Sequence, residues 1–198
     1  MPESSTRVDA THQGFAYRRD QFQQLVEDAL AFAKTAGATD AAAEVSEGGG
    51  LSVSVRKGEV ENIERNRDKS LSVTVYSGQR RGNASTSDFS RAALEQTVRA
   101  AHDIARFTAE DVAAGLPAQE DLALGEAALR DLDLFHPWDI HADGARDIAL
   151  RCEAAALGTD SRITNSEGAG VSAQQSHFFS GNSRGFRGGY ASSRHSLS

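Results

Sequence analysis

The sequence has very little cysteine, proline and tryptophan, and its last 31 residues contain no aspartate or glutamate. Cys152 is the single cysteine among 198 residues, so the chain cannot form an intramolecular disulfide, and such cysteine usage is typical of a reducing compartment. No apolar run approaches the roughly 18 residues that a membrane-spanning helix needs, and the polar start of the chain lacks the apolar core of a signal peptide. We therefore expect a cytoplasmic protein with no membrane partner.

Charge is distributed unevenly along the chain. Residues 1–167 carry all 28 acidic residues against 18 of the 21 Lys and Arg, a balance of −10, whereas residues 168–198 carry +3. Non-specific binding to nucleic acids depends on clustered Lys and Arg that neutralise phosphates. The net charge of −7 therefore argues against a nucleic-acid partner.

The hydropathy pattern predicts an α+β fold. Three segments have apolar residues at helical spacing: 19–34, 90–107 and 139–157. Five segments have strand character: 41–46, 51–56, 59–64, 71–75 and 80–85. Gly48–Gly50 are expected to end the first strand, and the interrupted alternation at Val60 and Ile63 predicts a bulge. Turns are expected at Lys57-Gly58 and Ser77-Gly78, and strand character returns from Ile163.

These elements divide the chain into four parts. We expect a flexible arm over 1–17, an α+β domain over 18–107 whose antiparallel sheet is covered by two helices, and a linker over 108–137. Residues 138–198 would supply the third helix and the start of a second, strand-rich unit. Because no capped ending precedes Ser198, we expect a chain truncated inside a sheet, with four aromatic residues partly uncovered: Phe178, Phe179, Phe186 and Tyr190.

Metal chemistry has little support in the sequence. No histidine is followed by glutamate, and HExxH, HExxxH and CxxC motifs are absent. The densest group of potential ligands is interrupted by Pro137: Asp133, His136, Asp139, His141 and Asp143. Aspartates at the start of a helix serve as caps and favour the helix dipole, so we interpret this group as a helix start.

The glycine-rich run after residue 180 permits two catalytic or binding interpretations, and we favour neither. Gly181–Gly185 reads G-x-S-x-G around Ser183, but a nucleophile elbow needs a following helix and a later acid, and His195 has no acidic residue after the serine to orient it. A phosphate loop would need a Gly-Lys-Ser/Thr ending. We expect a hairpin turn instead, with Arg184, Arg187 and Arg194 paired to carboxylates across an interface, because the preceding 167 residues are acidic.

Two further features have a structural and a functional interpretation. Cys152 lies on the apolar face of the third predicted helix and is expected to be a core residue rather than a nucleophile, because no neighbouring His or Lys would lower its pKa. The charged stretch with Glu59, Glu61, Glu64, Arg65 and Arg67 is either a solvated strand protected from edge-to-edge association or a surface that grips a partner or peptide.

Five runs together resemble the N-terminal part of the TldD/PmbA family, on the PmbA (TldE) side. They are 56–66 (RKGEVENIERN), 71–90 (LSVTVYSGQRRGNASTSDFS), 131–137 (DLDLFHP), 162–168 (RITNSEG) and 180–198 (SGNSRGFRGGYASSRHSLS). The resemblance covers residues 18 to 198 almost completely. Family members are longer than this chain, which agrees with a truncated chain.

The resemblance implies a component of a cytosolic heterodimeric metallopeptidase that degrades peptides or unfolded proteins. In this family TldD carries a zinc motif, HExxxH, in its C-terminal half, whereas the PmbA/TldE subunit lacks the motif and helps to enclose the peptide chamber. We therefore expect no catalytic, cofactor-binding or metal-ligating residue in this chain, with zinc in a TldD-like partner subunit. Two alternatives stay open: a catalytic family member whose zinc motif lies beyond Ser198, or a stand-alone binding module without enzymatic activity.

Overall fold

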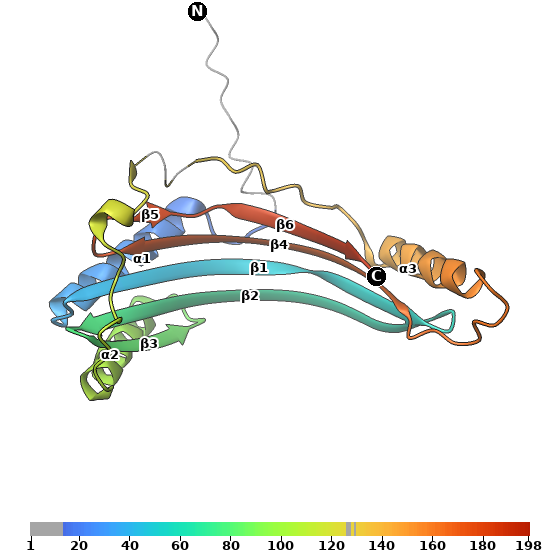
Figure 1. Ribbon diagram of the computed structural model, residues 1–198. Helices are drawn as coiled ribbons and strands as arrows, with labels where there is room; N and C mark the ends of the chain where they lie inside the picture. The colour runs from blue at the N-terminus through green and yellow to red at the C-terminus, as the bar shows by residue number, and fades with distance from the viewer. Residues whose placement is uncertain (1–13, 126–127, 129) are drawn as a thin grey trace, which may run out of the picture. The chain divides into compact units, whose positions relative to one another are not determined.

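The computed structural model describes residues 14–125, 128 and 130–198, and its elements are drawn in Figure 1. In chain order they are α1 (Arg19–Thr35), β1 (Asp40–Arg56), β2 (Glu59–Ser77), β3 (Arg80–Thr86), α2 (Arg91–Phe107), a 3-10 turn η2 (Gln119–Asp121), α3 (Ala142–Leu157), β4 (Ala169–Asn182), β5 (Arg187–Gly188) and β6 (Ala191–Leu197). The strands form one sheet in the order β3-β2-β1-β4-β5, and β6 also pairs with β4. The predicted α+β class with an antiparallel sheet is confirmed, although the later strands join the first sheet. Within the described residues, no helix is long and apolar enough to span a bilayer.

The prediction that Gly48–Gly50 end the first strand was wrong. Segments 41–46 and 51–56 form the single strand β1, and segments 59–64 and 71–75 form the single strand β2. A Cβ atom on Gly49 would lie 2.7 Å from the backbone oxygen of Asn66, and one on Gly50 would collide with the backbone oxygen of Ala173. Glycine continues a strand where a neighbouring backbone comes this close.

The predicted turns are confirmed. Lys57 and Gly58 connect β1 to β2 with φ values of 55° and 77°, and Gly78 connects β2 to β3 with φ of 60°. These are left-handed conformations that glycine adopts without a steric penalty. β3 then runs antiparallel to β2, with Ser77 opposite Arg80 and Leu71 opposite Thr86.

The chain forms two compact units that interleave along the sequence. Unit 1 contains residues 1–47, 69–132 and 177–190, and unit 2 contains residues 48–68, 133–176 and 191–198. Strands β1, β2 and β4 each contribute residues to both units. The predicted division at residues 107 and 138 stays a prediction about how the protein is organised.

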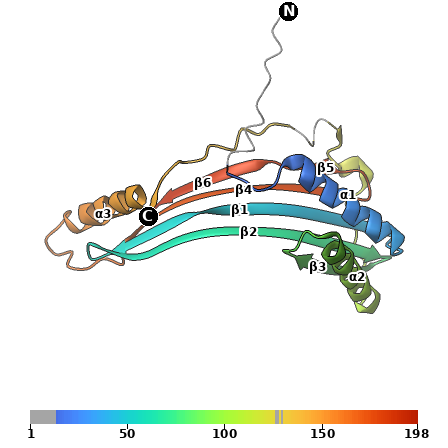
Figure 2. The same ribbon diagram turned by 180° about the vertical axis from the view of Figure 1, so that it is seen from behind.

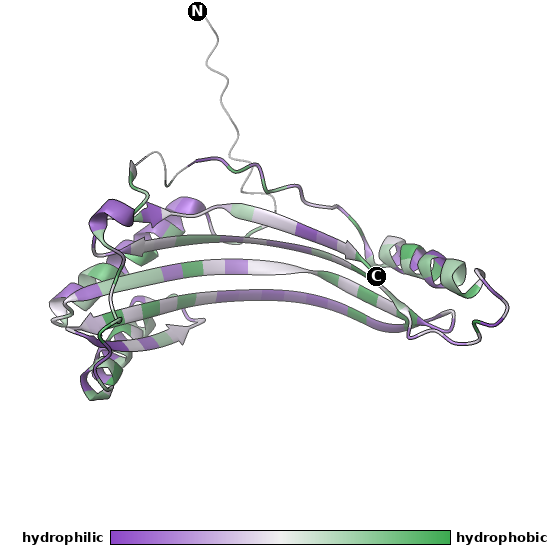
Figure 3. Cartoon of the chain, viewed as in Figure 1, coloured by the Kyte–Doolittle hydropathy of each residue, from purple (hydrophilic) through white to green (hydrophobic). Residues whose placement is uncertain are grey.

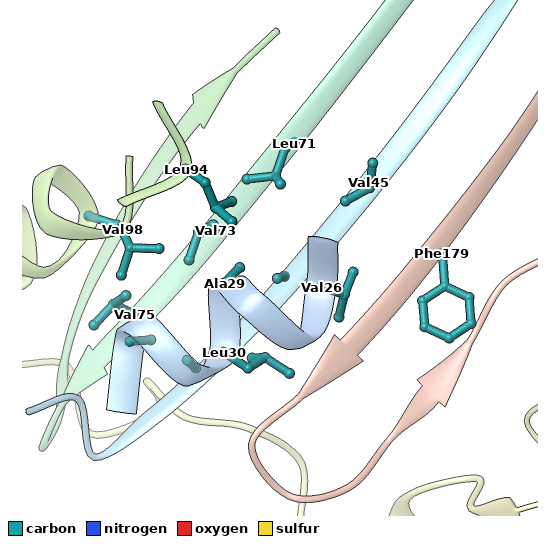
Figure 4. Close-up of a cluster of buried hydrophobic side chains, with 14 of the residues drawn as sticks. Val26, Ala29, Leu30, Val45, Leu71, Val73, Val75, Leu94, Val98 and Phe179 are labelled. Carbon is teal, nitrogen blue, oxygen red and sulfur yellow. The ribbon is translucent and has the colours of Figure 1, made fainter. Parts of the chain in front are cut away.

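Unit 1 has a core between its strands and the helices α1 and α2, both seen in front of the sheet in Figure 2. The predicted helix stripes supply this core from one side, with Phe22 and Val26 of α1 and Leu94 of α2 almost fully buried. Figure 4 shows how β1, β2 and β4 supply the other side with Val45, Val73 and Phe179 among others. Phe179 is only 1% exposed, so the expectation that it would be partly uncovered was wrong. Tyr190 is 41% exposed.

Unit 2 has a smaller core formed by α3 against β1 and β4, in which Ala145 and Ala149 are buried and Cys152 is partly buried. The helical spacing of apolar residues in 139–157 predicts a buried Ala156, and this prediction was wrong because Ala156 is exposed. Glu153 of the same helix is buried instead, with only 2% of its surface exposed. Strand β4 begins at Ala169, not at Ile163, whose side chain is 42% exposed.

The predicted arm and linker are described only in part. Residues 1–13 of the arm lie outside the described residues, whereas residues 14–17 are attached to unit 1 through hydrogen bonds from Ala16 and Tyr17. Within 108–137 the described residues contain the η2 turn and no strand. Residues 126, 127 and 129 of that predicted linker lie outside the described residues.

Candidate functional site

The acidic and histidine group before α3 does not converge on one point. His136 Nε2 lies 2.9 Å from the backbone oxygen and 3.6 Å from Oδ1 of Asp133, and Asp143 pairs with Arg146 at 2.9 Å. His141 is the N-cap residue of α3 and makes no side-chain cap bond, while Asp139 is exposed. In the part of the chain that the structure describes, no three His, Cys, Asp or Glu side chains lie close enough to hold a metal ion. A zinc site does not fit these residues.

Ser183 lies in a strand–turn–strand segment, as expected, because β4 and β5 pair antiparallel on either side of it. Its hydroxyl donates a hydrogen bond to Asp40 Oδ1 at 2.7 Å and accepts one from the backbone N–H of Ala41 at 3.1 Å. His195 has a different neighbour, since its ring packs edge-on against Trp138 with centroids 5.5 Å apart. The two hydrogen bonds of Ser183 tie this turn to the start of β1.

Two of the three late arginines pair with carboxylates, as expected, and both partners lie in the same unit of this chain. Arg184 Nη2 lies 2.6 Å from Asp40 Oδ2, and Arg187 binds both oxygens of Glu27 at 2.5 and 2.9 Å. Burial alone would raise the pKa of Asp40, but the hydrogen bonds from Arg184 and Ser183 outweigh burial and hold that pKa below its usual range. The hydrogen bond from Arg187 likewise lowers the pKa of Glu27. The pairing leaves the guanidinium groups of Arg184 and Arg187 engaged within unit 1, whereas Arg194 is exposed.

Two buried carboxylates were missed by the sequence prediction: Glu47 ties the segment before α1 to a strand, and Glu153 ties a turn to a helix. Glu47 is 2% exposed and accepts hydrogen bonds from the backbone N–H groups of Ala16 and Tyr17 at 2.9 to 3.1 Å. Its Oε2 lies 3.5 Å from Nε2 of His177, whose ring stacks on Phe22 with centroids 4.3 Å apart. This pair fixes the segment before α1 onto unit 1.

Glu153 performs the corresponding task in unit 2. Its two oxygens accept hydrogen bonds from the backbone N–H groups of Lys57 and Gly58 at 2.8 and 2.9 Å. The hydrogen bonds from Gly58 and then Lys57 lower the pKa of the Glu153 carboxyl, because they stabilise the charged form. A signal for both carboxylates was present in the sequence: Glu47 continues the alternation of Ala41, Ala43 and Val45, and Glu153 continues the four-residue spacing of Ala145 and Ala149.

The side of the unit 2 strands opposite α3 carries neutral hydrogen-bonding groups. We define the hydroxyl–amide row by its five members: Ser52, Ser172, Gln174, Ser176 and Ser192. The amide of Gln174 donates to the hydroxyls of Ser52 and Ser172 at 3.3 and 3.4 Å. Because successive side chains of a strand point to opposite faces, the row lies opposite Leu51, Val53 and Val171, which pack in the α3 core.

Unit 1 has a similar polar group on the strand faces turned away from its own core. Asn83 of β3 donates hydrogen bonds from Nδ2 to Ser72 Oγ at 3.3 Å, to Thr74 Oγ1 at 3.0 Å and to the backbone oxygen of Val73 at 3.2 Å. Val73 and Val75, on the opposite face of β2, are fully buried. In both units these groups are uncharged and can exchange their mutual hydrogen bonds for bonds to peptide N–H and C=O groups.

Comparison with known proteins gives two matching family models and a set of similar curated proteins. Residues 41–105 match the PmbA/TldA metallopeptidase domain 1, and residues 135–198 match the PmbA/TldA metallopeptidase central domain. The chain is 48% identical over 169 residues to Metalloprotease PmbA of Escherichia coli O157:H7, covering 85% of this chain and 36% of that protein. It is 44% identical over 181 residues to a Metalloprotease PmbA homolog of Haemophilus influenzae, covering 91% and 39%. The chain thus spans less than half the length of either relative.

Solved structures share this fold. A crystal structure from Bacteroides thetaiotaomicron, described as that of a candidate modulator of DNA gyrase, has a TM-score of 0.78 and 24% identity, covering 90% of this chain and 40% of that one. The crystal structure of TldE from Thermococcus kodakarensis has a TM-score of 0.70 and 13% identity, covering 87% and 38%. At these identities the likeness concerns the fold alone.

Proposed function

The chain belongs to the PmbA/TldD family of metallopeptidases, and from this premise we propose that it forms a chamber wall in the TldE-type, non-catalytic subunit of a two-subunit metallopeptidase. A TldD-like subunit would supply the zinc and the chemistry of peptide hydrolysis in the cytoplasm. This chain would bind that subunit and help to hold an extended peptide or unfolded polypeptide. The hydroxyl–amide row is the single observation that carries the proposal.

A row of neutral donors and acceptors suits a substrate that is recognised by its backbone. Every unfolded polypeptide presents N–H and C=O groups at each residue except proline. Hydroxyl and amide side chains can act as both donor and acceptor, so they can satisfy these groups whatever the sequence of the peptide. The five members of the row are themselves uncharged, so these side chains do not select a peptide by its charge.

In the described part of this chain no three potential metal ligands lie together. This observation supports a role in orienting and enclosing a peptide, with the zinc held by the partner subunit. The purified chain is expected to hold no stoichiometric zinc and to cleave no peptide. About one tightly held zinc per chain in elemental analysis would instead favour a catalytic family member.

Binding of a reduced, carboxymethylated polypeptide, followed by fluorescence anisotropy, tests the proposed peptide surface. The variant Ser172→Glu/Gln174→Glu puts two carboxylates into the row and should weaken binding of this acidic ligand at least about tenfold, because like charges repel. The matched control Ser87→Glu/Ser161→Glu adds the same charge at two exposed positions outside the row and should bind like the parent chain. Equal binding by both variants would refute the proposed surface.

A further inference from the structure

The first half of β2 is exposed to an unusual degree for a strand in a sheet. All ten residues from Glu59 to Asp68 are exposed, including Val60 at 41% and Ile63 at 51%. Successive strand residues point to opposite faces, so both faces of this segment are open in unit 2. Figure 3 shows the segment as a long hydrophilic stretch of β2.

This segment also has an open backbone edge. β3 pairs with β2 only from Leu71 to Ser77. On the side where β3 lies, no strand of residues 14–125, 128 and 130–198 pairs with Glu59–Asp68. An open edge presents unpaired N–H and C=O groups that can accept another strand.

The charges of the segment are ordered by sign. Glu59, Glu61 and Glu64 occupy its first half, and Arg65 and Arg67 follow in the second. Asp68 is the exception, and its carboxylate accepts a hydrogen bond from Asn66 at 3.4 Å. Glu59, Glu61, Glu64 and Arg65 make no ion pair or side-chain hydrogen bond with any described residue. Arg67 differs from them, because it does have an interaction partner. A single-sign edge would repel another copy of itself, whereas an edge with an acidic and a basic half does not.

We propose that Glu59–Asp68 is a self-association surface, on which the same segment of a second copy of this chain adds antiparallel to the open edge of β2. An antiparallel pair centred on Ile63 sets Glu59 opposite Arg67 and Glu61 opposite Arg65 of the second copy. A shift of two residues in either direction still sets a glutamate opposite an arginine. A parallel pair would set like charges together. Opposite charges at facing positions stabilise strand pairs, and like charges destabilise them. This surface is independent of the proposed peptide-binding row.

Sedimentation velocity of the 198-residue chain tests the proposal. A single strand pair buries less than the roughly 1,200 Å² at which stable interfaces begin, so we expect a monomer–dimer equilibrium with Kd on the order of 10 to 100 µM. Raising the salt from about 50 mM to about 500 mM should weaken it several-fold, because exposed charges are screened.

Three charge variants separate this pairing from other forms of association. The variant Arg65→Glu/Arg67→Glu, with glutamate at all four facing positions, and the variant Glu59→Arg/Glu61→Arg, with arginine at all four, should each be monomeric. A mixture of the two should dimerise, and the quadruple variant that carries both exchanges should dimerise alone, because each combination restores facing opposite charges. Thermal melting followed by circular dichroism checks that all the substitutions, at exposed positions, leave the fold intact.

The outcomes divide clearly. Loss of dimer in each double variant with recovery in the mixture supports the proposal. A parent chain that stays monomeric at about 200 µM in low salt would overturn it. A dimer that neither double variant weakens would also overturn it. The same holds if the chain does not bind itself but binds a TldD-like subunit through Glu59–Asp68.

Discussion

Val73→Asp is the substitution that most directly tests the assignment of faces in unit 1. Val73 is fully buried in β2, opposite Ala84 of β3, and packs in the core that α1 and α2 cover. Thr74, its neighbour in the chain, points to the other face and accepts a hydrogen bond from Asn83 at 3.0 Å. An aspartate at position 73 therefore enters the core, whereas an aspartate at position 74 retains an acceptor for Asn83 on the open face.

The expected cost has two parts. Removing the buried valine forfeits about 1.5 to 3 kcal/mol of hydrophobic stabilisation. The new carboxyl must stay protonated in the core, and holding it neutral at pH 7 against an ordinary pKa near 3.9 costs about 4 kcal/mol, at 1.36 kcal/mol per unit. The sum is about 6 kcal/mol, which is comparable with the whole stability of a domain, about 5 to 15 kcal/mol.

Urea denaturation followed by circular dichroism measures this loss. Val73→Asp should show no cooperative transition, or a greatly weakened one, at pH 7, and Thr74→Asp should stay within about 1 kcal/mol of the parent. Burial raises the folded-state pKa of the new carboxyl above its unfolded value, so the destabilisation should diminish as the pH falls toward about 4 to 5. A Val73→Asp chain that unfolds like the parent, or a Thr74→Asp chain that fails to fold, would refute the assigned faces.

Three further predictions concern the buried carboxylates and the glycines of β1. Hydrogen bonding lowers the folded-state pKa of Glu153. The stability that the ionised Glu153 contributes is therefore present above its unfolded-state pKa and is lost as the pH falls through its folded-state pKa. Glu153→Gln should flatten the decrease of Tm at acidic pH, measured as a pH–Tm profile. Gly50→Ala should lower Tm, since the added Cβ meets the backbone of Ala173, whereas Gly115→Ala, where nothing lies within 4 Å, should leave Tm unchanged. Glu47→Ala removes the acceptor of two backbone N–H groups and should cost about 1 to 3 kcal/mol of unfolding free energy, with faster proteolysis near residue 17.

The local elements of unit 1 could be predicted because their signals are local. The stripe that includes Phe22 and Val26 predicted the buried face of α1, and Ser90 was placed at the start of α2, where its hydroxyl caps the backbone N–H of Ala93. The Lys57-Gly58 turn was predictable for a similar reason, since glycine is permitted where φ is positive.

The long strands could not be predicted because their continuity depends on distant neighbours. Gly48–Gly50 have the composition of a loop, and only the closeness of Asn66 and Ala173 makes them strand residues. The site shows the same limit. The strand alternation at Glu47 and the helical spacing at Glu153 indicated buried carboxylates, but the backbone groups that bind them lie 30 to 96 residues away in the sequence. The hydroxyl–amide row likewise depends on β1 and β4 being neighbours in the sheet.

The interleaving of unit 1 has a consequence for how the protein folds during synthesis. Phe179 belongs to the same core as Phe22, and Arg187 pairs with Glu27 across 160 residues of sequence. At a translation rate of about 5 to 20 residues per second, α1 waits roughly 10 to 30 s for the strand that completes its core. During that interval the part of its apolar stripe that this strand covers is exposed to solvent or to a chaperone. Pulse proteolysis of ribosome-bound chains of increasing length should therefore show protection of α1 only after residue 187 has emerged.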